Sequence, residues 1–572
     1  MAARKTSQRT PTTQPPAIPL SGKPDPTPVL LAAERNPEQI HTILSAYGLI
    51  DVEQADRNLQ AMAGDPHERR QLAAILPLLL EAIARTADPD QALNHWERLL
   101  AGTTRSSLLD YLRSSPRMLD LLCTIFGNSD ALAFSIVRDP LLMYWLSEEA
   151  VLSKAPTREG IEQDLRRQLE RLTLKELKLD VLRRVRRREM LRIGVRDLLG
   201  LADVPETTAS LSDLAGLLID AAYGIVREDL RRQYGVPMHR SRQGKRVETE
   251  FAVIGMGKLG GHELNYSSDV DLIYVYGSHE GMTRLPRGRS GEKPAGVGIS
   301  NEHYFEMLSR ELTRALAEQT KEGAVFRVDL RLRAEGSVGP LARSLDDYKR
   351  YYAARGAAWE RLALLKAWPV AGSPKVGQAF LRMVKPFIFG AGAWTKRASD
   401  ALSVIKDVRA VKEMIDAKMA ERGHERRNVK LGTGGIREIE FLVQTIQVLL
   451  GRKIPALVER STLVSLKRLA DRRLISTEER KALIAAYLFL RDVEHKLQMV
   501  HDLPTHALPD DKEELARCAT RMGYEGEDRD AVRRRFVEDH DTHTGVVHEL
   551  FHSFFYEPKK PRLFKAVMRV LR

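Results

Sequence analysis

The sequence is poor in cysteine and lacks long uncharged hydrophobic runs. Its 572 residues include two cysteines, Cys123 and Cys518, far apart and without a CxxC context. A structural disulfide or a zinc site is therefore not expected, and a reducing cytoplasm is the expected location. The most apolar segment, LAAILPLLLEAIA, is interrupted by Pro and Glu. It is shorter than the ~20 apolar residues of a membrane helix, so no membrane partner is expected.

The first 30 residues lack the apolar core of a signal peptide. They are rich in Pro and Thr, which predicts a disordered tail over residues 1–30. The remaining length predicts two to four domains, and a content of 43% hydrophobic and 29% charged residues is typical of globular cores. The formal net charge of +13 favours acidic partners such as nucleotides, an acidic protein or nucleic acid, although it is spread along the chain.

The spacing of apolar residues predicts a mainly helical α+β protein. Spacings of three and four predict an N-terminal helical region at 31–205 and a C-terminal helical bundle domain at 373–572. Between them, at 206–372, the pattern changes to that of a small mixed sheet with helices. TEFAVIGMG, DVDLIYVY and AVFRVDLRLRAEG each read as a strand, separated by a glycine turn and a helix.

Two carboxylates stand two residues apart at the head of an apolar run. Asp269 and Asp271 belong to DVDLIYVY, and on a strand they point to the same side. Neighbouring buried carboxylates repel each other, and a divalent cation relieves that cost. Asp329, on a predicted neighbouring strand, could complete a site for two cations, because Mg²⁺ prefers oxygen ligands. These three residues are the predicted catalytic and metal-binding residues.

A glycine-rich turn precedes the carboxylates. Gly257 and its neighbouring glycines allow the backbone to approach a triphosphate closely. Lys258 adds a positive charge, and Ser267 and Ser268 add hydroxyl donors. Each signal is weak alone. Their combination with two later carboxylate-bearing strands predicts a nucleotidyl-transfer site rather than a turn followed by a solvated strand end.

Two arginines follow Asp329 at alternate positions. On a strand, Arg331 and Arg333 would lie on the same side as Asp329. Each could bind a phosphate in a bidentate manner. The alternative is an arginine ladder on a solvated strand face.

Three further clusters leave alternatives open. The arginines of the run 183–188 could face phosphates, or could form a solvated helix face or an acidic interface. The loop VKLGTGGIREIEF, with Arg437 and Glu438, could bind phosphate or adenine, or could connect two helices tightly. The segment EHKLQMVHDLPTHALPDD resembles part of a metal phosphohydrolase site. Its spacing does not give a full ligand set, so core or capping histidines are expected there.

Longer strings carry a family resemblance. Gly257-Lys258, ten residues and Asp-Val-Asp-Leu are similar to the signature of the DNA polymerase β-like nucleotidyltransferase superfamily, although Lys258 replaces the usual Gly or Ser. From about residue 100 to 555 the chain resembles the glutamine synthetase adenylyltransferase/adenylyl-removing enzyme family. The strings concerned are GMGKLGGHELNYSSDVDLIYVY, VDLRLRAEGSVGPLARSLDDYKRYY, WERLALLKAWPVAG, VKLGTGGIREIEF and LRDVEHKLQMVHDLPTHALP. Ala334 and Trp368 depart from the family's usual Pro and Arg, which bears on local loop shape.

The resemblance implies a polymerase β-like nucleotidyltransferase domain between the two helical regions. Members of the family usually have two such domains: an amino-terminal one that removes AMP from a tyrosine of glutamine synthetase by phosphorolysis, and a carboxy-terminal one that attaches AMP from ATP. ELNYSSDVDL, WERLALLKA and GGIREIEF look like the amino-terminal copy. The resemblance therefore implies a removing half, either stand-alone or paired with a separate second-half adenylyltransferase chain.

The resemblance also implies the reactants and partners. Mg²⁺ is the implied cofactor, with ATP, ADP and phosphate as substrates or products. Glutamine synthetase is the implied protein substrate, a PII-type signalling protein is a candidate partner, and no nucleic acid is expected. Two alternatives remain open: attachment of AMP to glutamine synthetase, and a catalytically silent docking half.

Overall fold

The computed structural model describes residues 22–285, 298–390, 398–421, 427–526, 528–557 and 562–571. It divides into two units, Met1–Val151 and Leu152–Arg572. Helices dominate both units, and the small sheets belong to the second. The expected class, mainly helical α+β, is confirmed. Residues 1–21 of the predicted tail lie outside the described residues. The first described helix begins at Pro28, inside the range 1–30 predicted as a tail.

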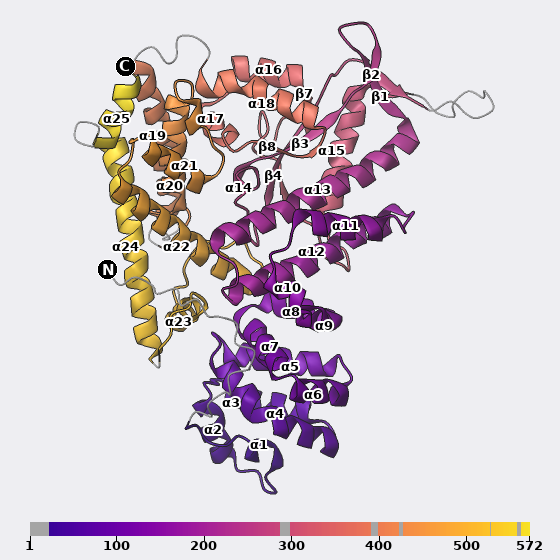
Figure 1. Ribbon diagram of the computed structural model, residues 1–572, viewed down its shortest axis with the longest axis vertical. Coiled ribbons are helices and arrows are strands. Elements are labelled where there is room, and N and C mark those ends of the chain that lie inside the picture. The colour runs from indigo at the N-terminus through magenta and orange to yellow at the C-terminus, as the bar shows by residue number, and fades with distance from the viewer. Residues whose placement is uncertain are drawn as a thin grey trace, which may run out of the picture. The chain divides into compact units, whose positions relative to one another are not determined.

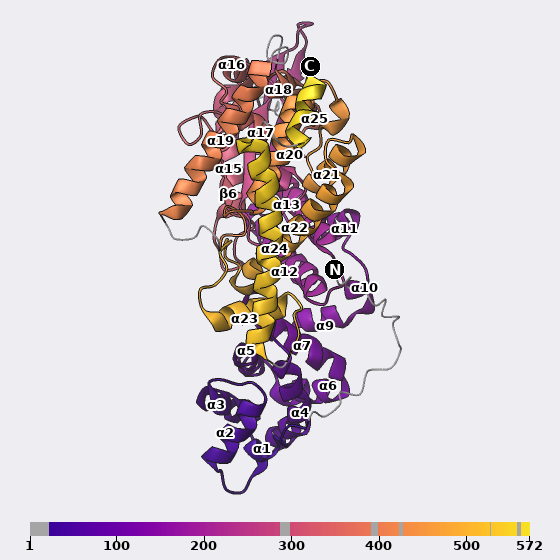
Figure 2. The same cartoon turned by 90° about the vertical axis from the view of Figure 1, so that its left-hand side faces the viewer.

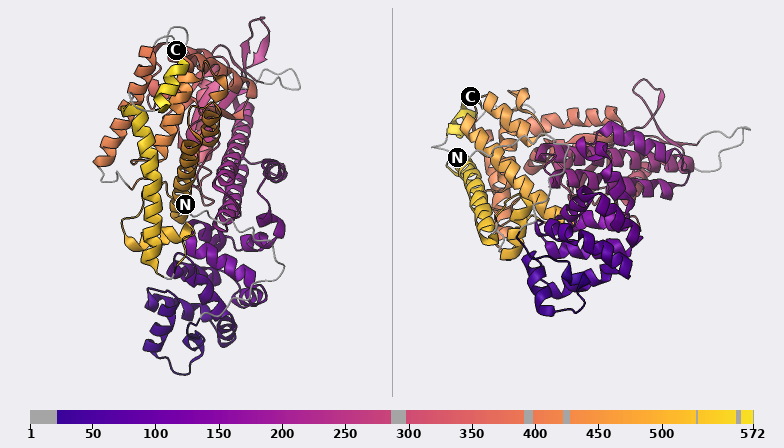
Figure 3. Two further views of the ribbon diagram at one scale, coloured as in Figure 1. Left: turned by 60° about the vertical axis from the view of Figure 1, so that its left-hand side comes forward. Right: turned by 60° about the horizontal axis from the view of Figure 1, so that its bottom comes forward.

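The first unit is a set of short helices, drawn in indigo and violet in Figure 3. Two of them begin at an Asp-Pro pair, in which Asp65 or Asp88 accepts amide hydrogen bonds of the first turn. Trp96 is buried in the unit's core. The helices are α1 (Pro28–Leu31), α2 (Pro37–Ala46), α3 (Val52–Ala63), α4 (Pro66–Ala84), α5 (Pro89–Ala101), α6 (Arg105–Ser114), α7 (Pro116–Asn128), α8 (Asp130–Arg138), α9 (Leu141–Ser147) and α10 (Glu149–Ser153).

The second unit contains the longer helices. They are α11 (Arg158–Leu169), α12 (Lys175–Leu198), α13 (Val204–Tyr234), α14 (Gly257–Gly260), α15 (Asn301–Ala317), α16 (Leu345–Ala354), α17 (Ala358–Leu364), α18 (Pro374–Phe389), α19 (Ala398–Ala420), α20 (Ile436–Leu450), α21 (Thr462–Asp471), α22 (Thr477–His501), α23 (Lys512–Arg521), α24 (Arg529–Tyr556) and α25 (Arg562–Leu571), with a short 3-10 helix at Pro455–Leu457. Helix α20 packs against α22 and α24, as Figure 2 also shows.

A five-stranded mixed sheet lies within the second unit. Its order is β6 (Val328–Asp329), β4 (Val270–Tyr276), β3 (Phe251–Gly255) and β8 (Trp368–Gly372), and β7 (Ala342–Ser344) also pairs with β4. Strands β3 and β4 are antiparallel, whereas β6 and β7 run parallel to β4. A smaller sheet has the order β2 (Arg246–Glu248), β1 (Val236–Arg240) and β5 (Met282–Arg284). The sequence did not predict the β1–β2 hairpin or β8.

Helix α13 packs against α12, α15 and β8, beside the sheet in Figure 1. Within the described part of the chain it is the one helix long and apolar enough to cross a membrane by length and composition. This corrects the expectation that no segment reaches that limit. Because 67% of its most apolar window is buried in the protein, α13 has the environment of a core helix and is weak evidence for a membrane span.

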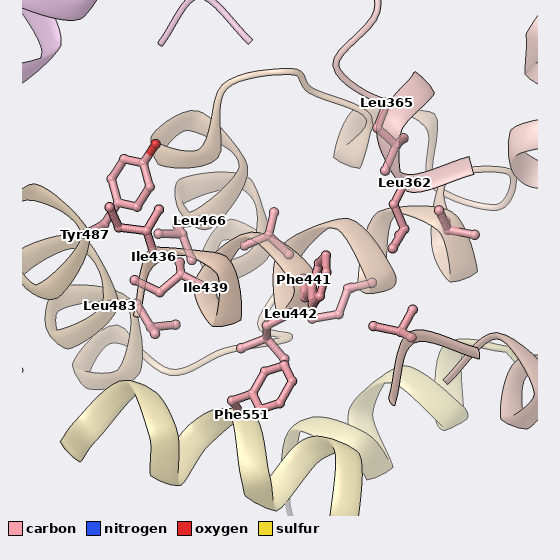
Figure 4. Close-up of a cluster of buried hydrophobic side chains, with 14 of the residues drawn as sticks. Leu362, Leu365, Ile436, Ile439, Phe441, Leu442, Leu466, Leu483, Tyr487 and Phe551 are labelled. Atoms are coloured by element: carbon pink, nitrogen blue, oxygen red, sulfur yellow. The ribbon is translucent and has the colours of Figure 1, made fainter. Parts of the chain in front are cut away.

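Helix α20 lies at the centre of a hydrophobic cluster. Figure 4 shows its Ile439 and Leu442 between Phe551 of α24 on one side and Leu466 and Leu483, of α21 and α22, on the other. Every residue of α20 except Arg437 is buried. A helix that is buried nearly all round needs neighbours on every side. The loop before α20 is therefore held in a fixed place relative to the sheet and α22.

Candidate active site

The structure brings three carboxylates together at one end of β4 and β6. Asp271 on β4 stands opposite Asp329 on the parallel strand β6. Side chains at paired positions of neighbouring strands share a face of the sheet. Asp269 lies two residues before Asp271, just ahead of the strand. The prediction that Asp329 lies on a strand adjoining the DxD pair is confirmed.

The carboxylates act on one another electrostatically. Burial and the negative charge of Asp329 raise the pKa of Asp271 to about 6, and Asp269 adds to this effect. The positive charges of Lys430 and Arg437 oppose it. Asp271 is thus a crowded, mostly buried carboxylate whose negative charge is stabilised by any cation that approaches.

The other two carboxylates are each paired with an arginine. Arg327 Nε lies 2.7 Å from Asp269 Oδ1. The Arg331 guanidinium contacts Asp329 at 2.5 Å, and its amide donates to the same carboxylate at 2.8 Å. Although burial raises the pKa of Asp329, these bonds hold it below its usual value. In this arrangement no group of three or more His, Cys, Asp or Glu among the described residues is poised to hold a metal ion.

The donor set nevertheless fits Mg²⁺ in its chemistry, because carboxylate oxygens are the ligands that this ion prefers. Gly257 leaves the space beside Asp271 open: a Cβ there would lie 2.5 Å from Asp271 Oδ2, and its φ of +53° favours glycine. Joint binding of a cation by all three carboxylates requires Arg327 and Arg331 to release Asp269 and Asp329. The metal role of these residues stays a prediction.

The residues of the predicted phosphate turn contact α22. Lys258 Nζ lies 2.6 Å from Glu494 Oε1, and the Glu494 side chain is fully buried. Ser267 Oγ donates to the Asp502 carbonyl at 2.7 Å. Ser268, which follows Ser267 in the sequence, is half-buried. In this structure Lys258 and Ser267 therefore join the turn to α22, and their roles toward phosphate stay predictions.

The predicted strand that carried Arg331 and Arg333 is wrong beyond Asp329. Strand β6 ends there, and residues 331–339 form turns. Arg333 is buried and donates to the carbonyls of Leu330 at 2.8 Å and Gly339 at 2.9 Å. It therefore fixes the shape of the turn. Arg331 remains beside Asp329 with 78% of its side chain exposed.

The basic run of α12 is used in ion pairs. Arg183 pairs with Asp180 at 2.9 Å, Arg184 with Glu322 at 4.0 Å, Arg186 with Asp502 at 3.8 Å, Arg187 with Glu322 at 3.1 Å and Arg188 with Asp164 at 2.7 Å. Among the open alternatives, the acidic interface describes this helix best.

The histidine-rich segment has structural contacts, as expected. His495 is fully buried, with Nε2 3.2 Å from Asn265 Oδ1. His506 Nδ1 lies 2.8 Å from Glu494 Oε1. Asp502 ends α22 in a left-handed conformation, with φ +51°. His495 is thus a core residue, and Asp502 is the residue that caps α22.

Arg327 and Glu494 had no prediction from sequence, and Lys430 was not singled out within the loop VKLGTGGIREIEF. Arg327 alternates with Asp329 in FRVD, a signal of the kind applied to Arg331. Glu494 and Lys430 follow Asp271 by more than 150 residues, and no local pattern links them to it. The contact of Glu494 with Lys258 joins α22 to the glycine turn, and α20, which follows the loop of Lys430, packs against α22.

Two family models match the chain. Residues 119–383 match the model described as "Glutamate-ammonia ligase adenylyltransferase". Residues 409–555 match the model described as "GlnD PII-uridylyltransferase". The first range contains the sheet with all three carboxylates, and the second contains α20 and α22.

Curated relatives named bifunctional glutamine synthetase adenylyltransferase/adenylyl-removing enzyme match over long ranges. The protein of Nitrosococcus oceani is 38% identical over 442 residues, 77% of this chain and 43% of that protein. That of Thioalkalivibrio sulfidiphilus is 42% identical over 366 residues, 63% of this chain and 35% of that protein. That of Streptomyces coelicolor is 33% identical over 488 residues, 84% of this chain and 44% of that protein. The chain spans less than half of the length of these relatives, and over the part that it shares with them it is similar to the glutamine synthetase adenylyltransferase/adenylyl-removing enzymes.

Proposed function

We propose that this chain is a nucleotidyltransferase that removes AMP from an adenylylated tyrosine of glutamine synthetase. Inorganic phosphate is the acceptor and ADP the product. The observation that supports this best is the register pairing of Asp271 with Asp329, beside Asp269 and the Gly257 turn. This group lies inside the range that matches an adenylyltransferase family model.

The proposed reaction exchanges one bond to phosphorus for another. A phosphate oxygen bonds to the phosphorus of AMP, and the bond from that phosphorus to the tyrosine oxygen breaks. The tyrosine oxygen keeps the electron pair and takes up a proton. Bound Mg²⁺ would neutralise the phosphate oxygens and so lower the cost of bringing anions together.

The residues of the chain contribute position and charge. Strands β4 and β6 hold Asp271 and Asp329 side by side, and we propose that both bind the metal. Gly257 keeps side-chain atoms away from Asp271. Rigid placement of this kind lowers a barrier without any covalent role for the protein. We propose on the same grounds that the sheet with its flanking helices has the polymerase β-like nucleotidyltransferase fold.

Partners and location are part of the proposal. Glutamine synthetase is the proposed protein substrate, in keeping with the names of the relatives. The match of residues 409–555 to a PII-uridylyltransferase model supports regulation through a PII-type protein. Two free, buried cysteines are consistent with the reducing cytoplasm that we propose as the location.

Two reactions test the proposal. Purified chain is mixed with adenylylated glutamine synthetase, phosphate and Mg²⁺, and ADP is measured; separately it is given unmodified synthetase with ATP, and AMP incorporation is measured. ADP formation that is lost in Asp271→Asn supports the removing activity. AMP incorporation alone would instead assign the attaching activity. Absence of both reactions, with retained binding of the synthetase, would indicate a silent docking half and refute the proposal.

A further inference from the structure

We propose that Arg327 and Arg331 are phosphate-binding residues of this site, held on its carboxylates until a divalent cation takes their place. The inference rests on the proposed function and deepens it, because it assigns the ligands of the reacting phosphate group. It also implies that a cation and a phosphate group bind to the site together better than either binds alone.

The Arg331 side chain engages both oxygens of the Asp329 carboxylate. Its Nε lies 3.1 Å from Oδ1 and 2.9 Å from Oδ2, and its Nη2 lies 2.5 Å from Oδ2. Over the described residues, these are the hydrogen bonds that the Arg331 side chain makes, and 78% of it is exposed. Because exposed ion pairs contribute little to stability, the guanidinium group can leave Asp329 at small cost.

Asp329 keeps its orientation when the guanidinium group leaves. The backbone amide of Arg331 donates to Asp329 Oδ1 at 2.8 Å, and this bond does not depend on the arginine side chain. Strand pairing holds the backbone of Asp329 opposite Asp271. Release of the side chain therefore frees Oδ2, the oxygen that Nη2 approaches, as a ligand for a cation.

Arg327 and Asp269 form the second pair. The register that sets Val270 opposite Val328 sets Arg327 opposite Asp269, one position earlier in each chain segment. Arg327 Nε lies 2.7 Å from Asp269 Oδ1, with 48% of the arginine and 44% of the aspartate side chain exposed. Arg327 Nη2 also donates to Ser267 Oγ at 3.1 Å. This second contact keeps the guanidinium group beside the predicted phosphate turn after Nε leaves Asp269.

The chemistry of the two pairs suits an exchange of carboxylate for phosphate. A guanidinium group binds either anion through the same parallel hydrogen bonds. Three carboxylates and two guanidinium groups bring the site close to charge balance. A divalent cation alone would add an excess of positive charge, and a phosphate group would remove that excess. Binding of the cation and binding of the phosphate therefore favour each other.

Two other basic side chains that the sequence suggested for phosphate are less free to move. Lys258 pairs with Glu494, whose side chain is fully buried. Arg333 is buried and donates to carbonyl groups of its own turn. Moving either cation would leave a buried polar or charged group without its partner, which is costly. Arg327 and Arg331 are exposed, so their release carries no such cost.

The test compares Arg327→Met and Arg331→Met with the wild-type chain, and uses Arg166→Met as the matched control. Arg166 Nη2 lies 2.9 Å from Glu162 Oε1 on α11, and 67% of the arginine side chain is exposed. Three dissociation constants are measured. The Kd of Mn²⁺ without nucleotide is followed by electron paramagnetic resonance, because Mn²⁺ shares the preference of Mg²⁺ for oxygen ligands. The Kd of ADP and the Kd of inorganic phosphate, both with Mg²⁺, are measured by calorimetry.

The dissociation constants should move in opposite directions in the two arginine variants. Removal of a competing cation should lower the Kd of Mn²⁺ about threefold. Loss of a charged hydrogen bond to phosphate should raise the Kd of ADP or of inorganic phosphate about tenfold or more. A residue with only a structural role would not make Mn²⁺ binding tighter. A rise for ADP alone assigns the arginines to the nucleotide phosphates, and a rise for inorganic phosphate assigns them to the acceptor.

The outcomes separate the inference from the proposed function. A Kd of Mn²⁺ that falls in neither variant, or phosphate and ADP constants within twofold of wild type in both, would overturn the inference. If the wild-type chain still forms ADP from adenylylated glutamine synthetase, the proposed function stands in that case. Opposite shifts in a chain that forms no ADP would support the inference and overturn the proposed function. Thermal midpoints show which variants fold, and the exposed Arg331 keeps the test decisive if Arg327→Met does not.

Discussion

Removing the charge of Glu494 should destabilise the second unit strongly. Its fully buried carboxylate lies 2.6 Å from Lys258 Nζ, 2.8 Å from His506 Nδ1 and 3.4 Å from Arg491 Nε. Glu494→Gln keeps the shape and leaves Lys258, with only 11% of its side chain exposed, without its counter-ion. Breaking a buried ion pair on one side costs about 3–5 kcal/mol. At about 2–4 °C per kcal/mol for large domains, the thermal midpoint should fall by roughly 6–20 °C.

The midpoint is measured by calorimetry and circular dichroism, with Glu228→Gln as the control. Glu228 pairs with Arg232 and with Lys178, each at 3.6 Å, and 57% of its side chain is exposed. Such a change is expected to stay within about 0.5 kcal/mol. The double variant Lys258→Met/Glu494→Gln should recover part of the loss, because removing both partners is far less costly. If Glu494→Gln lowers the midpoint no more than Glu228→Gln, the buried pair does not hold the turn to α22.

Three further predictions concern the site and the core. Asp271→Asn should lower kcat for ADP formation by about 10³-fold or more, since a metal ligand supplies several kcal/mol. The thermal midpoint of this variant at pH 8 should not fall below that of the wild-type chain. The reason is that burial raises the pKa of Asp271, so the neutral side chain suits the site better. Gly434→Ala should lower the thermal midpoint more than Gly523→Ala. Both glycines have a positive φ, but of the two only Gly434 would place a Cβ against other atoms, 2.0 Å from the Thr544 carbonyl oxygen. Equal losses in the two variants would argue against this packing. Burial lowers the pKa of His495, so below pH about 6.5 the unfolded chain binds a proton that the folded chain does not. The free energy of unfolding, measured by urea titration, should therefore fall from pH 7 toward pH 5. His495→Gln should make this pH dependence weaker.

Local periodicity was enough to find the carboxylates. Asp269 and Asp271 stand two residues apart at the start of an apolar run, and Asp329 follows a β-branched residue in FRVDL. The alternation of side chains along a strand is a backbone property, so it can be read without knowledge of the tertiary structure. The pairing of Asp271 with Asp329 followed from placing the two predicted strands side by side.

The extent of β6 could not be predicted in this way. Arg331 and Arg333 keep the alternation, but the chain turns after Asp329, and Arg333 is buried on the carbonyls of that turn. An alternating arginine looks the same on a strand and inside a turn. Strand β8 was missed for a related reason: Pro369 within it argues against a central strand, and the structure places β8 at the edge of the sheet.

The contacts that join the glycine turn and the sheet to the loop before α20 and to α22 could not be predicted from sequence. Lys258 meets Glu494 across 236 positions of the chain, and Lys430 reaches the neighbourhood of Asp271 only through the packing of α20. Such pairs depend on how complete elements pack together. Gly434 serves a tight connection, which is one of the two alternatives left open for the loop at 429–441, and phosphate binding by this loop stays a prediction.

Metal binding tests the central claim most directly. Mn²⁺, which has the same preference for oxygen ligands as Mg²⁺, is titrated into the chain with ADP and followed by electron paramagnetic resonance. If the three carboxylates hold the cation jointly, Asp269→Asn, Asp271→Asn and Asp329→Asn should each weaken Mn²⁺ binding at least tenfold, while Asp346→Asn, outside the site, leaves it unchanged. Mn²⁺ binding of wild-type strength in Asp271→Asn and Asp329→Asn would contradict the account.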